Sequence, residues 1–591
     1  MPLTSVSFVC AQIEGALHHF SGSELHCVPS TPADIILAMD LLITVLTLLA
    51  AVLAVTPRER QLDIRVRVRK FDRFVIVVSF ALVLGLEFYE FLQPHYSWLP
   101  PKDKWWTGIT PKNAMYLVVL CEAAFLAVRL RWAKLTPGKM LTFRDLVEEL
   151  YWNGSYSELF ALLQAHLKSL FKIYSADYFL PRLRAMLNPL PSVHVSLSVV
   201  NELRAARGMP ALPRSTPPFL REAYSRVRWF VKSRGWRLIR LFPVNDAAQE
   251  SAREVVRGIF LSPKFLTALA LTRPYLGLEI IKLSKNSFER SDFVDLFVKE
   301  LLRDPHSVLF REIQNNQNIR HERYEIVPSN QFIHFFLSDV KVAKELGIYK
   351  PIGDFVIAYL EGFTRNPQDD PYNRSYDNDF EQTGIWRSPL FLCIRFFDIM
   401  VREALFQNMF WHMWLYYLPL ICECMVRNFR LDDPLAKKEY EFPTRYAYLL
   451  YQMFSSLRDW ILAIRDIPPD QTNVFLKSTS PAFDENGNIP KSSIIALARC
   501  LYTVLESPNV GSRTKRSLTD LVFNIYFDLR ASGKFDRYAE VLLTAISEGK
   551  SYRQNNHEYQ ETLANLFEEE KDEYLIKRDE DHVAYVESVL N

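Results

Sequence analysis

Three long apolar runs near the N-terminus are the strongest feature of the hydrophobic pattern. They cover residues 34–56, 74–92 and 114–131, and each approaches the length of about twenty residues that a helix needs to cross a bilayer. The third run is the shortest, but Arg129 and Arg131 can reach the headgroups, and Trp132 suits the membrane interface. We therefore predict three transmembrane helices, with a buried soluble helix as the alternative for the third run.

Basic residues on either side of these runs predict their orientation. The first 57 residues contain no Lys or Arg, whereas seven basic residues lie between the first two runs, at Arg58, Arg60, Arg65, Arg67, Arg69, Lys70 and Arg73. Loops rich in Lys and Arg stay on the cytoplasmic side of a membrane. We predict an integral membrane protein with an extracytoplasmic N-terminal segment at 1–33 and a cytoplasmic C-terminus.

Beyond residue 140, apolar residues recur at the spacing of one helix face, and Pro-rich breaks separate the segments. This pattern predicts a mainly α fold: three transmembrane helices within 34–132, then a large all-α cytosolic domain. We expect helical parts at 140–365 and 384–548, a polar loop between them that could be a lid or a partner contact, and a charged tail at 549–591. Glycine turns near Gly154 and Gly533 indicate helix hairpins of the solenoid type, although no fixed repeat period connects them.

The most hydrophobic stretch of the predicted cytosolic part covers residues 409–426. Because Pro419 and Glu423 interrupt it, we expect a buried core helix and keep a fourth transmembrane span as the alternative. The preceding residues 395–408 have the pattern of an amphipathic helix.

Composition narrows the class of protein further. Hydrophobic residues make up 49% and charged residues 23% of the chain, which excludes a disordered or collagen-like polymer. The whole-chain net charge of +2 favours no particular partner. Seven cysteines without a CxxC pair argue against a zinc ribbon or a disulfide scaffold. Cys10 and Cys27 both precede the first apolar run, and whether they form a disulfide stays open.

Known catalytic and cofactor motifs are missing from the sequence. We find no phosphate-binding GxxxxGK, no GxGxxG, no GxSxG and no HExxH. We therefore predict no cofactor, no metal site and no catalytic residue. An enzyme with an unrecognised site remains an alternative.

Four carboxylates lie within the apolar runs, all in the predicted outer half of the bilayer: Asp40, Glu87, Glu90 and Glu122. Ionisable residues at this depth are costly, and they often mark an ion path. They are our candidate ion path, which requires a homo-oligomer because three helices cannot enclose a wide aqueous channel. The alternative is that protonated carboxyl groups hydrogen-bond neighbouring helices.

A basic segment with interleaved aromatic residues lies between residues 204 and 240. Such a segment can bind anionic headgroups at a membrane surface. A solvated face with acidic intramolecular partners is nearly as well supported, and nucleic acid is the least favoured partner. The candidate headgroup-binding residues are Arg221, Arg226, Arg228, Trp229, Lys232, Arg234, Trp236, Arg237 and Arg240.

These features together predict a membrane-anchored signalling or effector protein. Its helical cytosolic domain would bind a protein partner or respond to a stimulus, and its oligomeric membrane part would respond, in one version as a cation-permeable pore. The alternative from a different class is a non-conducting scaffold that tethers protein partners at the inner membrane face.

Overall fold

The computed structural model of the chain is mainly helical, which confirms the all-α prediction. The chain forms two compact units, residues 1–135 and 136–591. The structure describes residues 57–68, 70–89, 93, 109–132, 134–176, 246–284, 289–320, 323–407, 409, 414–430, 442–466, 489–549 and 557–590.

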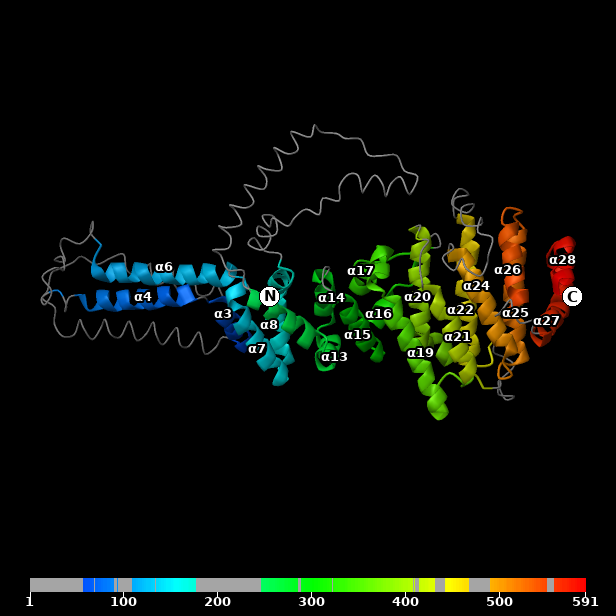
Figure 1. The fold of residues 1–591 in the computed structure, drawn as a ribbon, viewed down its shortest axis with the longest axis horizontal. Coiled ribbons are helices and arrows are strands. Elements are labelled where there is room, and N and C mark those ends of the chain that lie inside the picture. The colour runs from blue at the N-terminus through cyan, green and yellow to red at the C-terminus, as the bar shows by residue number, and fades with distance from the viewer. Residues whose placement is uncertain are drawn as a thin grey trace, which may run out of the picture. The chain divides into compact units, whose positions relative to one another are not determined.

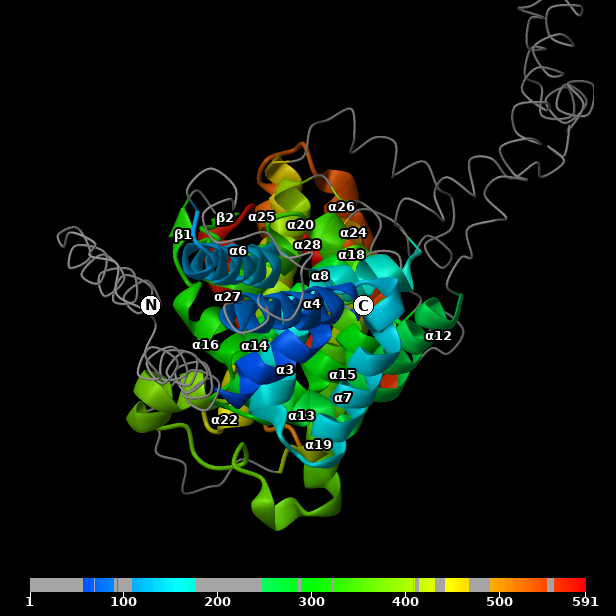
Figure 2. The same ribbon diagram turned by 90° about the vertical axis from the view of Figure 1, so that its left-hand side faces the viewer.

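The first unit contains a short helix and a helical hairpin. The short helix is α3 (Arg58–Arg67), and the hairpin pairs α4 (Lys70–Glu87) with α6 (Pro111–Trp132). Both views show α4 and α6 lying side by side (Figures 1 and 2). These two helices cover most of the second and third apolar runs, whereas the first run at 34–56 lies outside the described residues.

None of the described helices, taken singly, is long and apolar enough to cross a membrane. Two consecutive helical segments, Asp246–Phe260 and Pro263–Thr272, are together long and apolar enough, but the chain bends by 73° between them.

The second unit begins with a helix hairpin, α7 (Met140–Trp152) and α8 (Tyr156–Tyr174), after a 3₁₀ turn η3 (Pro137–Lys139). Gly154 has a φ of 70° in the connecting turn, which is a left-handed conformation that glycine adopts without strain. The next helices are α12 (Asp246–Glu254), the π-helical η4 (Val255–Phe260), α13 (Pro263–Thr272) and α14 (Pro274–Leu283). Helix α12 packs against both α7 and α8.

From α13 onward the helices stack in two layers. In one layer, consecutive members pack on one another in the order α13, α15 (Arg290–Arg303), α19 (Tyr349–Arg365), α21 (Tyr417–Asn428), α24 (Ile489–Glu506) and α26 (Asp536–Glu548). The other layer contains α16 (Val308–Asn315), α20 (Pro389–Phe406), α22 (Arg445–Leu462), α25 (Ser512–Arg530) and α27 (His557–Lys577). The colours of Figure 1 follow this chain order from green to red.

Shorter elements complete the second unit. A two-stranded antiparallel hairpin, β1 (Ile319–Arg320) and β2 (Arg323–Tyr324), follows α16. Helices α17 (Gln331–Leu337) and α18 (Val340–Leu346) precede α19, and α28 (Glu580–Leu590) packs on α27. The remaining turns are η5 (Pro367–Asp369), η6 (Phe380–Gly384), η7 (Ile385–Arg387), η8 (Trp414–Tyr416) and η9 (Ala463–Asp466).

Three segments that the sequence predicted lie within the second unit. The hydrophobic stretch 409–426 contributes α21, whose Ile421, Cys422 and Met425 are buried. The two helical parts expected at 140–365 and 384–548 lie within one compact unit. The charged tail supplies α27 and α28, and Phe567 and Val583 are buried there.

The polar segment between α19 and α20 is fastened to the core along its length. Tyr372 is buried, and its hydroxyl lies 2.9 Å from Oγ of Ser388. The backbone of Ser375 pairs with that of Thr444, and the amide of Arg445 donates to the carbonyl of Arg374. These contacts hold the polar segment 366–383 against the start of α22.

Candidate functional site

The hairpin of the first unit exposes large apolar side chains. Phe74, Val77 and Leu120 are about two-thirds exposed, at 64%, 65% and 65%. The other large exposed apolar residues on α4 and α6 are Phe71, Val78, Phe80, Leu82, Tyr116, Leu117 and Val128. Many exposed large apolar side chains on one pair of helices indicate a protein interface or a membrane contact.

A buried ion pair joins the two helices of the hairpin at one end. Nε of Arg129, near the end of α6, donates to Oδ1 of Asp72 at 3.1 Å, and Asp72 in the first turn of α4 is only 1% exposed. Since the beginning of α4 meets the end of α6, the helices run antiparallel. A charge pair with one fully buried member is costly to break, because the carboxylate that remains would stay buried without its cationic partner Arg129.

The Asp72–Arg129 pair is a reference point for the positions of the candidate ion-path residues along the hairpin axis. Glu87 lies fifteen residues beyond Asp72 on α4, and Glu122 lies seven residues before Arg129 on α6. At 1.5 Å per residue, their levels differ by about 12 Å. The structure therefore does not bring these two carboxylates together at one level. Asp40 and Glu90 lie outside the described residues.

All nine candidate headgroup-binding residues, from Arg221 to Arg240, fall within 177–245, which is outside the described residues.

The second unit contains a feature that the sequence reasoning missed, a set of buried charges on α20. This helix begins after Ser388, whose Oγ accepts a hydrogen bond from the amide of Phe391 at 3.2 Å, and Pro389 occupies its first turn. Its apolar residues are buried on several sides, and so are the carboxylates Asp398 and Glu403, which are both 0% exposed. The helix predicted at 395–408 lies largely within α20, and neighbours on several sides cover its polar positions Asp398 and Glu403.

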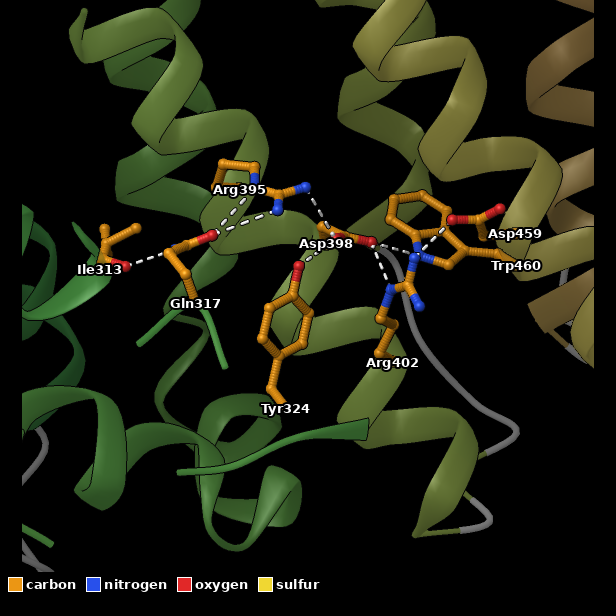
Figure 3. Close-up of polar contacts among 8 residues, drawn as sticks. All are labelled: Ile313, Gln317, Tyr324, Arg395, Asp398, Arg402, Asp459 and Trp460. Carbon is orange, nitrogen blue, oxygen red and sulfur yellow. Dashed lines mark hydrogen bonds and ion pairs between the residues drawn. The ribbon is translucent and has the colours of Figure 1, made fainter. Parts of the chain in front are cut away.

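Asp398 accepts hydrogen bonds from four side chains (Figure 3). Its Oδ2 accepts from the Tyr324 hydroxyl at 2.5 Å and from Arg395 at 3.4 Å. Its Oδ1 accepts from Nε1 of Trp460 and from Nε of Arg402, both at 3.0 Å. These donors come from β2, α20 and α22. A carboxylate has about four lone-pair sites, so Asp398 is fully satisfied without water.

The arginines extend this network to further elements. Arg402 also donates to Oδ2 of Asp459 on α22 at 2.5 Å. The guanidinium of Arg395 donates to Oε1 of Gln317 at 3.2 Å, and Gln317 in turn donates to the carbonyl of Ile313 in α16 at 2.5 Å. One carboxylate on α20 thereby links α16, β2 and α22, as the dashed lines of Figure 3 show.

Glu403, the residue after Arg402, forms a second buried ion pair. Arg323 donates from NH2 to Oε2 at 2.8 Å and from Nε to both carboxylate oxygens at 3.1 Å. The guanidinium also lies over the ring of Phe406, 5.7 Å from its centre. Gln407 donates to Glu403 at 3.2 Å and accepts from the amide of Val340 at 3.0 Å, which connects α18 to the same helix.

Burial and charge shift the pKa values of several members of this network. Burial raises the pKa of Tyr324, and the negative charge of Asp398 raises it further, so Tyr324 stays protonated and donates. Burial disfavours the charged form of Arg402, but the negative charge of Asp398 outweighs this effect. The pKa of Arg402 is therefore raised. Burial raises the pKa of the Asp459 carboxyl, although Arg402 opposes that rise. Tyr324 and Arg402 are thus held in fixed protonation states, which suits a structural role better than proton transfer.

The described part of the chain also gives little support for bound metal. No group of three or more His, Cys, Asp and Glu side chains there could hold a metal ion. The chain matches no protein-family model, and no curated protein or solved structure matches it.

A signal for the α20 network was present in the sequence. Asp398 and Glu403 lie in a largely apolar run, with Arg395 three residues before Asp398 and Arg402 four residues after it. Charged residues are almost never fully buried unless they are paired. Paired opposite charges inside an apolar helix therefore indicate a buried ion-pair network, whereas the partners Tyr324 and Trp460 could not be found from spacing.

Proposed function

We propose that the protein is a membrane-anchored scaffold. Its hairpin α4–α6 lies in the bilayer, and its helical stack binds protein partners at the cytosolic face. The observation that carries the proposal is the contrast between the two units: α4 and α6 expose Phe74, Val77 and Leu120, whereas α20 and α21 bury nearly all of their large apolar residues. A lipid environment would cover those exposed side chains.

The charge distribution of the hairpin supports the proposed orientation. The Asp72–Arg129 pair marks the end at which α3 with its four arginines, Arg129 and Lys134 all lie. A basic end is the cytosolic end by the positive-inside rule. The chain continues from this same end into the second unit at residue 136.

The form of the stack supports the scaffold role. Helices stacked in two layers present long continuous surfaces that bind other proteins. The charges at the centre of the stack, Asp398 and Glu403 with their arginines, join several helices to α20. Such fully satisfied buried networks hold helices in one register. A rigid, extended helical surface needs no catalytic group to act as a docking platform.

A cation-permeable pore formed by a homo-oligomer is the second proposal. It rests on Glu122, which lies eleven residues after Pro111 and ten before Trp132, at the middle of α6. An ionisable side chain at such a depth requires a polar partner or a water-filled path.

Membrane topology tests the anchor. Reporter fusions after residues 30, 65, 103 and 150 are expected to report outside, inside, outside and inside, since the basic loop at 58–73 is retained in the cytoplasm. The measurement is reporter activity in intact cells, and fusions should also resist alkaline extraction from membranes. An extracytoplasmic reading at residue 150, or release of the full chain by alkali, would contradict the anchor.

Ion flux separates the two proposals. Proteoliposomes containing the wild-type chain are expected to hold a cation gradient, because a scaffold provides no conducting path. The measurement is cation-sensitive dye fluorescence, with empty liposomes as the control. Flux from the wild type that falls in the double variant Glu87→Gln, Glu122→Gln would favour the pore, because the field that attracts cations would be weakened.

A further inference from the structure

Two cysteines from different helices meet inside the stack. Cys422 lies on α21 and Cys500 on α24, which are consecutive helices of one layer and pack against each other. Both are free thiols in the structure, and both are completely buried. Neighbouring helices in a stack can move relative to one another at the seam between them. A covalent link across the seam between α21 and α24 would restrict that motion.

The geometry brings the two residues into direct contact. Sγ of Cys422 lies 3.8 Å from the main-chain oxygen of Cys500, a weak hydrogen bond donated by the Cys422 thiol. Cys424, two residues further along α21, is turned away from this contact, since successive helical positions two apart point in nearly opposite directions. Cys424 therefore provides an internal comparison with the same helix and the same chemistry.

We propose that Cys422 and Cys500 form a reversible disulfide that braces the seam between α21 and α24. With hydrogen peroxide as oxidant, one thiol is first converted to a sulfenic acid with release of one water. The other thiol then attacks the sulfenic sulfur, the S–S bond forms, and a second water leaves. In sum, two thiols are oxidised and one peroxide is reduced to two molecules of water. This proposal does not depend on membrane anchoring.

Burial controls when this reaction takes place. Contact with Cys500 and burial both raise the pKa of the Cys422 thiol, and the thiolate is the reactive form. The pair is therefore protected while the seam is closed and reacts when the seam opens. The bond forms during an opening event, and afterwards it holds α21 against α24. Seventy-seven residues separate the two positions in the chain, and closing a long loop of this kind constrains the unfolded state strongly.

The test is oxidation of the full chain in detergent with hydrogen peroxide, followed by alkylation, proteolysis without reductant and mass spectrometry. We expect a linked Cys422–Cys500 peptide and an apparent Tm about 3 °C higher than in the reduced protein. A reductant should reverse both. The variant Cys424→Ser should keep the link and the shift, whereas Cys500→Ser should lose them.

Two results would overturn the proposal. One is oxidation of Cys121 or Cys424 with no linked Cys422–Cys500 peptide in the folded protein. The other is a linked peptide that forms only after the chain has been denatured. If Cys500→Ser fails to fold, Cys422→Ser and Cys500→Ala replace it, and the peptide analysis of the wild type decides the question by itself.

Discussion

Replacing Asp398 by alanine is expected to lower the free energy of unfolding of residues 136–591 by about 3–5 kcal/mol. The substitution removes the acceptor for Tyr324, Arg395, Arg402 and Trp460 at once. Arg402 keeps Asp459, but Tyr324 and Trp460 lose their only partner in Figure 3 and remain inside the protein. The measurement is urea unfolding followed by tryptophan fluorescence and circular dichroism.

Asp459→Ala is the matched control for this prediction. The Asp459 side chain is 39% exposed, and its loss leaves Arg402 paired with Asp398. Partly exposed ion pairs contribute roughly 0–1 kcal/mol, so this variant should remain close to the wild type. Equal destabilisation by the two substitutions would mean that Asp398 does not organise the network.

Gly353→Ala is expected to destabilise the same unit by about 3 kcal/mol, at the upper end of the range for overpacking. A Cβ at position 353 of α19 would overlap the ring of Tyr417 on α21. The ring has little freedom to move away, since the Tyr417 hydroxyl donates to Oδ1 of Asp354 at 2.8 Å. Thermal unfolding of the purified variant measures the loss of stability, which we attribute to the contact between α19 and α21.

A second glycine on the same helix provides the comparison. Gly362 lies on α19 with no other atom within 4 Å of the position that a Cβ would take. Because alanine favours helix more than glycine does, Gly362→Ala should be neutral or stabilising by up to about 1 kcal/mol. If both variants lost stability equally, flexibility of α19 rather than the contact with Tyr417 would explain the result.

The local sequence predicted the helices well, because their determinants lie within a few residues. The Gly154 and Gly533 turns mark the ends of α7 and α25, and both glycines have positive φ. The apolar spacing of residues such as Leu159, Leu163 and Leu170 anticipated the buried face of α8. A helix needs only this periodicity and suitable ends to be recognised.

The long-range contacts that hold the helices of the stack together could not be predicted from the local sequence. Asp398 meets Tyr324 across 74 positions and Trp460 across 62. Periodicity shows which face of α20 is apolar, but not which distant side chains will arrive to satisfy a buried carboxylate. The contacts of the polar segment 366–383 could not be predicted for the same reason, since the backbone of Ser375 pairs with Thr444, which lies 69 residues further along the chain.

The order of helices in the stack also bears on how the chain folds during synthesis. Each helix of the two layers packs mainly against helices that lie close to it in the sequence, from α13 to α28. Contacts of this kind carry a small loop-closure penalty, and folding can propagate along the array from wherever it begins. As the chain leaves the ribosome, each new helix pair meets a surface that its predecessors have already formed.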